Sequence, residues 1–262
     1  LMLVLAGIIF WAYNQKRKNN EILTKKNQQI NDQNRKLEEV YLQISEKNKD
    51  ITDSINYAKR IQNSILVPES EIKKGLKNFF LIYLPKDIVS GDFYYYSPLQ
   101  NGFILGVVDC TGHGVPGAFM SMIGNDAMNQ IINESNINEP GKILTQLHKN
   151  VKTALRQNKE GTETQDGMDI SLCKIDMNAQ KIEFSGAYNS LYLFRNGSND
   201  LTEIKADKAG IGGVENENDT VFTNNKTSLS KDDVFYLFSD GYKDQFGGNK
   251  NKRFGSRKFK EL

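Results

Sequence analysis

Residues 103–118 read Phe-Ile-Leu-Gly-Val-Val-Asp-Cys-Thr-Gly-His-Gly-Val-Pro-Gly-Ala. The apolar run at its start predicts a buried strand that ends at Asp109. The glycines at 112, 114 and 117 let the backbone turn tightly, so that a helix can begin at Val115. A carboxylate that follows five apolar residues leaves the core at the edge of a sheet, where its charge needs a partner.

Other aspartates occupy similar places. Asp92 follows Ser-Gly at the start of an aromatic run, Asp240 ends the apolar run from Val234, and Asp244 follows four residues later. Asp166 and Asp169 open another apolar run. Few Lys or Arg accompany these segments, so a divalent cation is the simplest counter-charge, and all-oxygen ligands favour Mg²⁺ or Mn²⁺ over zinc. Taken alone, each Asp is better explained as a turn or N-cap residue.

The pattern of elements predicts an α+β fold in which antiparallel sheets pack under helices. Helices are expected from Val115 to about Glu134 and from Pro140 to about Asn158. Short apolar or aromatic runs predict the strands Phe79–Leu84, Asp92–Tyr96, Phe103–Asp109, Ile170–Ile175, Lys181–Ala187, Leu191–Arg195, Thr220–Thr223 and Val234–Phe238.

The composition excludes several protein classes. The chain has 262 residues, of which 38% are hydrophobic and 25% charged, so it is neither disordered nor collagen-like. The net charge of +2 is too small for nucleic acid to be the main partner. Cys110 and Cys173 lie in separate apolar runs, which predicts reduced, buried thiols rather than a disulfide.

Four segments occur together in the order and approximate spacing of one family. They are residues 85–94, residues 108–118, residues 184–189 and residues 238–244. On these motifs the chain resembles the PPM metal-dependent Ser/Thr protein phosphatases, in particular the SpoIIE/RsbU-like branch. The resemblance covers about Ile72 to Leu262, and Ile51–Ile65 resembles the helix that precedes the domain in membrane-linked members. It implies a β-sandwich flanked by helices, with two metal ions at one edge.

Carried over by position, the resemblance implies a set of metal ligands. Asp109 would bridge two Mn²⁺ or Mg²⁺ ions, the carbonyl of Cys110 would bind one of them, and Asp92 and Asp240 would bind on either side. Asp166 and Asp244 match positions of an additional, weaker metal in some relatives, and Asp169 is the alternative to Asp166. The implied reaction is hydrolysis of a phosphomonoester by a metal-activated water.

Two further residues are candidates for the chemistry. His113 is a candidate general acid for the leaving oxygen, and the alternative is a structural role in its Gly-His-Gly turn. Lys86 is a candidate for orienting the substrate phosphate, and the alternative is a solvated surface lysine.

The N-terminal part has two distinct patterns. Leu1–Tyr13 is uncharged, ends in interfacial aromatics and is followed by Lys16-Arg17-Lys18, which predicts the end of a transmembrane helix with its basic flank in the cytoplasm. It is shorter than the roughly 20 residues that span a bilayer, so a helix that begins earlier is assumed. Between 14 and 66, apolar residues recur every seven positions at Leu23, Ile30, Leu37, Ile44, Ile51, Ala58 and Ile65. This heptad predicts a parallel, dimeric coiled-coil linker; the alternative is a solvated single helix, because the second seam row is ragged.

Together these features predict three segments: the membrane helix end (1–13), the coiled-coil linker (14–66) and the phosphatase domain (72–262). We expect a protein anchored in the cell membrane with a cytoplasmic catalytic domain. The expected partner is a phosphorylated regulatory protein such as an anti-sigma factor antagonist, on the strength of the resemblance. The competing interpretation is a catalytically inactive scaffold that binds a phosphoprotein. A third interpretation, an esterase or nuclease, is disfavoured because the sequence has neither a nucleophile elbow nor a basic nucleic-acid face.

One departure from the family is visible. Members normally continue with a further helix and a strand that bears a late Asp, whereas this sequence stops at Leu262. We therefore expect the chain to be a piece of a longer sensor protein, and a poor enzyme in isolation.

Overall fold

A computed structural model describes residues 1–157, 164–198, 200–213, 219–248 and 251–261. The chain divides into two units, Leu1–Ser54 and Ile55–Leu262. Helix α1 spans Met2–Ile65. Its part up to Ser54 forms the first unit, and its last turns belong to the second unit. No Pro or Gly occurs between 14 and 66, which explains the unbroken helix, and Pro68 follows its end.

The heptad residues of α1 are exposed within the single chain. Leu23, Ile30, Leu37, Ile44 and Ile51 each leave half or more of their surface uncovered. A row of this kind can be buried by a second helix, but the pairing itself remains a prediction. In the described part of the chain, no helix combines the length and the apolar character needed to cross a membrane.

The second unit is built on antiparallel sheets. Among the described residues, the larger sheet has six strands: β1 (Phe93–Leu99), β2 (Gly102–Cys110), β3 (Gly167–Asp176), β4 (Lys181–Ala187) and β8 (Asn225–Ser228) lie in that order, and β7 (Ile211–Gly212) also pairs with β3. The smaller sheet has the order β6 (Leu201–Ile204), β5 (Leu191–Phe194) and β9 (Val234–Tyr236). The remaining short elements are α2 (Glu69–Gly75), β10 (Phe246–Gly247), β11 (Lys252–Arg253) and α5 (Gly255–Lys260).

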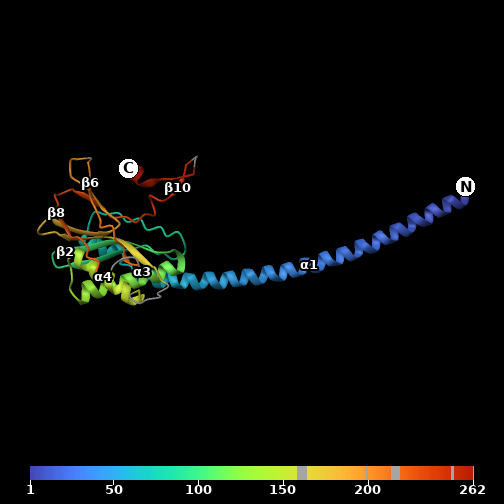
Figure 1. Ribbon diagram of the computed structural model, residues 1–262, viewed down its shortest axis with the longest axis horizontal. Helices are drawn as coiled ribbons and strands as arrows, with labels where there is room; N and C mark the ends of the chain where they lie inside the picture. The colour runs from blue at the N-terminus through green and yellow to red at the C-terminus, as the bar shows by residue number, and fades with distance from the viewer. Residues whose placement is uncertain (158–163, 199, 214–218, 249–250, 262) are drawn as a thin grey trace. The chain divides into compact units, whose positions relative to one another are not determined.

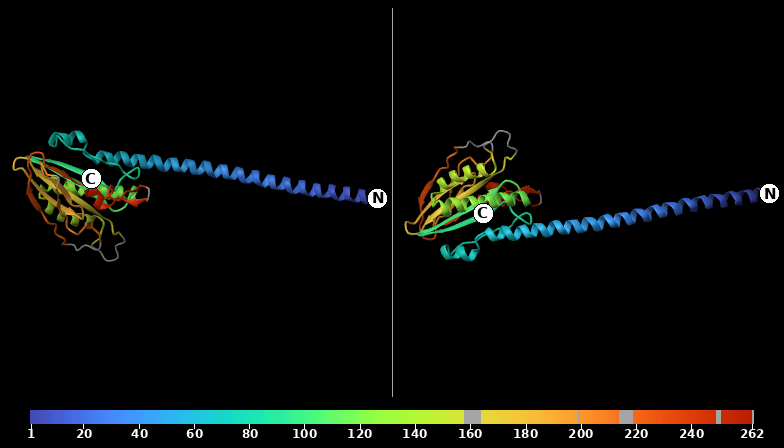
Figure 2. Two further views of the ribbon diagram at one scale, coloured as in Figure 1. Left: turned by 90° about the horizontal axis from the view of Figure 1, so that it is seen from above. Right: turned by 90° about the horizontal axis from the view of Figure 1, so that it is seen from below.

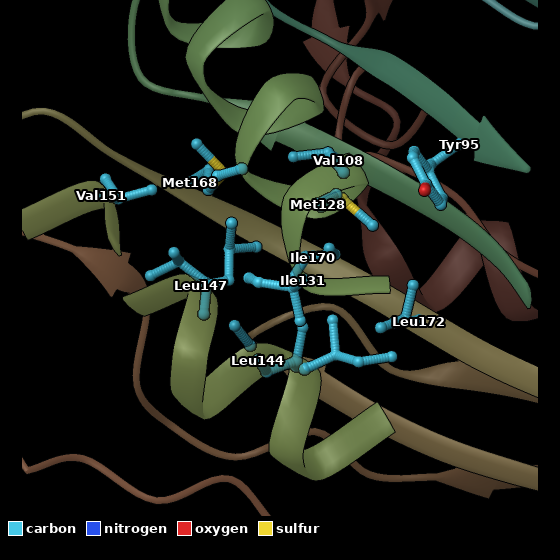
Figure 3. Packing of buried hydrophobic residues seen from close by; sticks show 14 of the residues in the cluster. Tyr95, Val108, Met128, Ile131, Leu144, Leu147, Val151, Met168, Ile170 and Leu172 are labelled. Carbon is cyan, nitrogen blue, oxygen red and sulfur yellow. The ribbon is translucent and has the colours of Figure 1, made fainter. Parts of the chain in front are cut away.

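Helices cover one face of the larger sheet. α3 (Gly114–Asn129) continues into a π-helical turn, η1 (Gln130–Glu134), and lies beside α4 (Pro140–Ala154) (Figures 1 and 2). Figure 3 shows Leu144, Leu147 and Val151 of α4 packed toward Ile170 and neighbouring strand residues. Each fully buried Leu or Ile contributes about 1.5–3 kcal/mol, so this stripe fixes the helix on the sheet.

The alternation of side chains along the strands separates two cores. In β2, Ile104 and Val108 face the helices, whereas Phe103 belongs to a second cluster with Leu191 and Leu193 of β5. The larger sheet therefore has the helices on one face and the smaller sheet on the other, as period-2 alternation requires. This is a mixed fold with antiparallel sheets in two packed layers, as the sequence predicts.

Several predicted elements differ in detail. Phe79–Leu84 has no strand assignment in the structure, and the strand predicted at Thr220–Thr223 lies instead at Asn225–Ser228. β9 ends at Tyr236 rather than Phe238, and α4 ends at Ala154; Asn158, its expected end, lies outside the described residues. Apolar alternation predicts which face of a segment is buried. It does not predict whether a hydrogen-bonded strand lies beside the segment, so the strand bounds differ from the prediction.

Candidate active site

Three carboxylates lie next to one another at one edge of the larger sheet. Asp109, near the end of β2, is directly opposite Asp169 of β3. Phe93 is opposite Val108, so Asp92 lies beside Asp109 at the start of β1. Directly opposite residues share a face, and the alternation described above places this face toward the smaller sheet. The edge of the two-layer sandwich thus gathers residues from three strands.

The loop after β9 completes this edge. The hydroxyl of Ser239 donates a hydrogen bond of 2.6 Å to Oδ2 of Asp92. The backbone N–H of Asp240 donates to Oδ2 of Asp109 at 3.2 Å. The structure therefore brings Asp240 to Asp92 and Asp109, as the sequence predicts, but its backbone amide makes the contact with Asp109. Ser239 was missed by the sequence analysis, although its place directly before Asp240 was a usable signal.

The clustered negative charge perturbs the acidity of these groups. Burial, followed by the nearby charges of Asp92 and Asp240, raises the pKa of Asp109 to about 8. Burial and the charge of Asp240 raise the pKa of Asp169 to about 6. Burial also raises the pKa of Asp240, and the charge of Asp244 adds to this. Such shifts mark carboxylates whose charge lacks sufficient compensation.

Backbone contacts permit the close approach of these segments. A Cβ at Gly91 would lie 2.6 Å from the carbonyl oxygen of Gly112 and 3.2 Å from that of Cys110. A Cβ at Gly117 would lie 2.9 Å from Cα of Gly91. Gly112 also has a φ of +88°, a conformation that favours glycine. Only glycines thus let the segment that carries Asp92 press against the turn after Asp109.

Thr111 fastens this turn to the start of β3. Its N–H and its hydroxyl both donate to the carbonyl of Gly167, at 2.9 and 3.1 Å, and Gly167 N–H donates back to the hydroxyl at 3.0 Å. These bonds hold the ends of β2 and β3, and with them Asp109 and Asp169, in fixed register.

His113 lies directly before α3 and is exposed. Its Nδ1 is 2.8 Å from Oδ2 of Asp87, an acceptor that the sequence analysis did not single out. A proton on Nδ1 would be donated to this carboxylate, which leaves Nε2 available. Lys86 is an exposed side chain, and among the described residues no hydrogen bond or ion pair is found for it. The structure thus gives His113 a defined partner and leaves Lys86 as a surface lysine.

Asp166 and Asp244 are placed differently from the inner carboxylates. Asp166 precedes β3, and its backbone carbonyl accepts a 2.6 Å hydrogen bond from the side chain of Gln157. Asp244 forms an ion pair with Arg253, whose Nε donates to Oδ1 at 2.8 Å. Sequence spacing could not show this ion pair, and the role of Asp244 at an additional metal stays a prediction. Asp169, the alternative to Asp166, lies directly opposite Asp109, and its role as a ligand stays a prediction.

The side chains at this edge are of the chemical type that binds a divalent cation. The carboxylates of Asp92, Asp109, Asp169 and Asp240 are hard oxygen donors with poorly compensated charge, as Mg²⁺ and Mn²⁺ prefer. Burial raises the pKa of the Cys110 thiol well above its usual range, so only its carbonyl is a suitable donor. However, within the described ranges no three Asp, Glu, His or Cys side chains are grouped as a metal site requires. Hydrogen bonds from Ser239 and Asp240 engage one oxygen of Asp92 and one of Asp109.

The raised carboxylate pKa values predict how the metal-free protein responds to pH. The ordinary value is 3.8, so the folded protein retains a proton that the unfolded chain has released on Asp109 between about pH 4 and 8, and on Asp169 between about pH 4 and 6. Stability is therefore greatest at low pH within this window and falls as pH rises. With EDTA present, we expect the free energy of unfolding to be lower at pH 8 than at pH 5, by on the order of 2 kcal/mol after solvent screening. Denaturant titrations at the two pH values measure this, and a stability that rises with pH would contradict it.

Comparisons with known proteins agree with this fold. The sequence profile of the family described as Stage II sporulation protein E (SpoIIE) matches residues 100–262. The structure matches the SiaA-PP2C domain of Pseudomonas aeruginosa with a TM-score of 0.72 and 34% sequence identity, over 82% of this chain and 81% of that one. It also matches the PP2C phosphatase domain and regulatory fragment of SpoIIE from Bacillus subtilis, with a TM-score of 0.43 and 24% identity, over 59% and 41% of the two chains. None of the curated proteins compared with the chain matches it in sequence.

The fold and the family match define the class as the PP2C, or PPM, phosphatases. Within that class, the chain belongs to the SpoIIE family. The resemblance to the SpoIIE/RsbU-like branch, inferred from four short motifs, is confirmed.

Proposed function

We propose that this protein is a metal-dependent phosphoprotein phosphatase that hydrolyses phosphoserine or phosphothreonine in bacterial signalling. The observation that carries the proposal is the gathering of Asp92, Asp109 and Asp169 at one sheet edge, with the Ser239–Asp240 loop against it. The negative charge there is concentrated enough to raise the pKa of Asp109 and Asp169. In a phosphatase this negative charge would serve to bind metal ions. In a module that only binds a phosphate, the same charge would repel the ligand.

The proposed roles follow from the placement of the side chains. Asp92, Asp109, Asp240 and the carbonyl of Cys110 would hold Mn²⁺ or Mg²⁺, and the ions would supply an acidified water and neutralise phosphate oxygens. Ser239 and Thr111 hold the carboxylates and the strand ends in place through their hydrogen bonds. The chain's own acid would be His113. In the imidazolium form, Nδ1–H would donate to Asp87 and Nε2–H would give its proton to the leaving serine oxygen, which leaves neutral imidazole.

The competing function is a phosphoprotein-binding scaffold without turnover. The hydrogen bonds that engage Asp92 and Asp109 favour it, because within the described residues the carboxylates do not form a three-ligand group. The two functions differ in one observable, the release of inorganic phosphate.

Hydrolysis of a phosphoserine peptide by the wild-type protein, with Mn²⁺ or with EDTA, tests the proposal. We expect phosphate release that depends on Mn²⁺, because the carboxylates alone repel a phosphate. The control is Asp126→Asn, which alters an exposed α3 carboxylate bonded only to Gln130 in the described structure and should leave turnover unchanged. Binding of the peptide without phosphate release at any Mn²⁺ concentration would favour the scaffold instead.

The setting of the domain is also part of the proposal. The uncharged Leu1–Tyr13 and the basic residues after it support a membrane anchor with the domain in the cytoplasm. The exposed heptad of α1 supports a parallel dimer through which an upstream signal reaches the domain. The family supports a phosphorylated regulatory protein, such as an anti-sigma factor antagonist, as substrate and partner.

A further inference from the structure

Gln62 is distinctive among the residues of α1. Its side chain is only 2% exposed, whereas nearly all of the described helix is solvent-exposed. It lies in the last turns of α1, within the unit Ile55–Leu262. A polar side chain is buried at a cost unless it is hydrogen-bonded, so its partners identify its role.

The amide of Gln62 forms three hydrogen bonds. Its Nε2 donates to the carbonyl of Ser90 at 2.6 Å and lies 2.8 Å from the hydroxyl of Ser121. Its Oε1 accepts from the N–H of Ser90 at 3.0 Å. The side-chain amide thus pairs with both polar groups of one backbone residue, as a neighbouring strand would.

Ser90 belongs to the segment that carries Asp92. Gly91, between them, packs against the carbonyl oxygens of Gly112 and Cys110. The phenol of Tyr83 donates to the carbonyl of Asp92 at 3.2 Å, on the far side of this short segment. The position of Asp92 therefore depends on contacts to a segment with no regular secondary structure, and Gln62 supplies two of them.

The third hydrogen-bond partner of Gln62 lies on the helix that follows Asp109. Ser121 lies on α3, which follows the turn after Asp109, and its hydroxyl also donates to the carbonyl of Ala118 at 2.8 Å. Through one amide, the end of α1 is joined both to the Asp92 segment and to the helix that follows Asp109.

We infer that Gln62 is a positioning residue that sets the distance between Asp92 and Asp109, and so couples the end of α1 to the metal-binding carboxylates. The inference rests on the proposed function and names the residue through which the linker acts on that site. A displacement of the last turns of α1 breaks three hydrogen bonds at once and frees the Asp92 segment. Neither Glu, which lacks the donor, nor Met, which has no amide, can replace this pairing.

The test compares Gln62→Met with Gln43→Met in the full chain. Both changes remove an amide and keep side-chain length and helix propensity, but Gln43 is exposed. In Gln62→Met we expect faster amide hydrogen exchange in residues 90–92 and unchanged exchange in β3. Calorimetric titration should show Mn²⁺ binding weakened about 10- to 100-fold, which is the usual effect of removing a residue that orients a metal ligand. Gln43→Met should change neither.

A second variant covers the case in which Gln62→Met does not fold. Ser121→Ala removes one of the three bonds and should give smaller changes of the same sign in both measurements. Unchanged exchange at 90–92 and unchanged Mn²⁺ affinity in the folded variants would overturn the inference. Hydrogen exchange is measured without metal, so it decides the role of Gln62 even if the wild-type protein releases no phosphate, the outcome that would refute the proposed function.

Discussion

Asp109→Asn should lower Mn²⁺-dependent phosphate release by at least about 100-fold while making the metal-free protein more stable. The loss follows because the carboxylate between Asp92, Asp169 and Asp240 is the central one of the proposed site. The gain in stability follows because a neutral amide removes the cost of burying a charge and the repulsion by Asp92 and Asp240, which together raise the pKa of Asp109. Near pH 8 each kcal/mol gained would raise Tm by about 2–4 °C.

The opposite signs of these two effects make the experiment specific. A residue with a purely structural role would lose activity and stability together. Phosphate release and thermal unfolding with EDTA should be measured on the same preparations, with Asp126→Asn as the matched change of an exposed carboxylate. Full turnover in folded Asp109→Asn protein would refute the assignment of this carboxylate as a metal ligand.

Replacing Ile44 and Ile51 by Asp should convert a dimer to a monomer. Both side chains are more than half exposed in the single chain and lie seven residues apart in the heptad row. In a parallel pair, each substitution would bury like charges across the seam, at a cost of several kcal/mol per dimer. Sedimentation of the chain from Asn14 onward measures the change in mass.

Leu42→Asp is the matched control for this prediction. Leu42 is also exposed, but it falls outside both seam rows of the heptad, so its replacement should leave a dimer intact. A wild-type chain that stays monomeric at high protein concentration, or equal dissociation by Leu42→Asp, would show that α1 does not pair through the predicted row.

The central strands and the inner site residues could be predicted because their signals are local. β2 and β3 alternate between two buried faces, and an Asp that ends such a run can only emerge at the sheet edge. The register of β2 and β3, which places Asp109 opposite Asp169, was not predicted and is known from the structure. Sequence pattern and packing agree in this region, which is why four short motifs were enough to identify the family.

The remaining contacts depend on chain segments that meet only after folding. Gln62 has no sequence signal, because an amide in a polar helix resembles every other exposed glutamine until Ser90 is placed beside it. The pairing of Asp244 with Arg253 likewise depends on the pairing of β10 with β11. The Phe79–Leu84 pattern predicted a strand, and its alternation is real, since Phe80, Ile82 and Leu84 are the exposed members. Alternation alone, however, does not supply a hydrogen-bonded neighbour.

The contact between Gly91 and Gly117 has a consequence for how this site can change during evolution. Catalytic surfaces usually diversify by exchanging side chains on a fixed backbone, but here two main-chain segments touch without any side chain between them. A methyl group at Gly117 would push the Asp92 segment and α3 apart, and one at Gly91 would collide with the carbonyl oxygen of Gly112. The spacing of the carboxylates thus depends on a backbone contact, so changes in the surrounding loops can leave this edge of the sheet with the same dimensions.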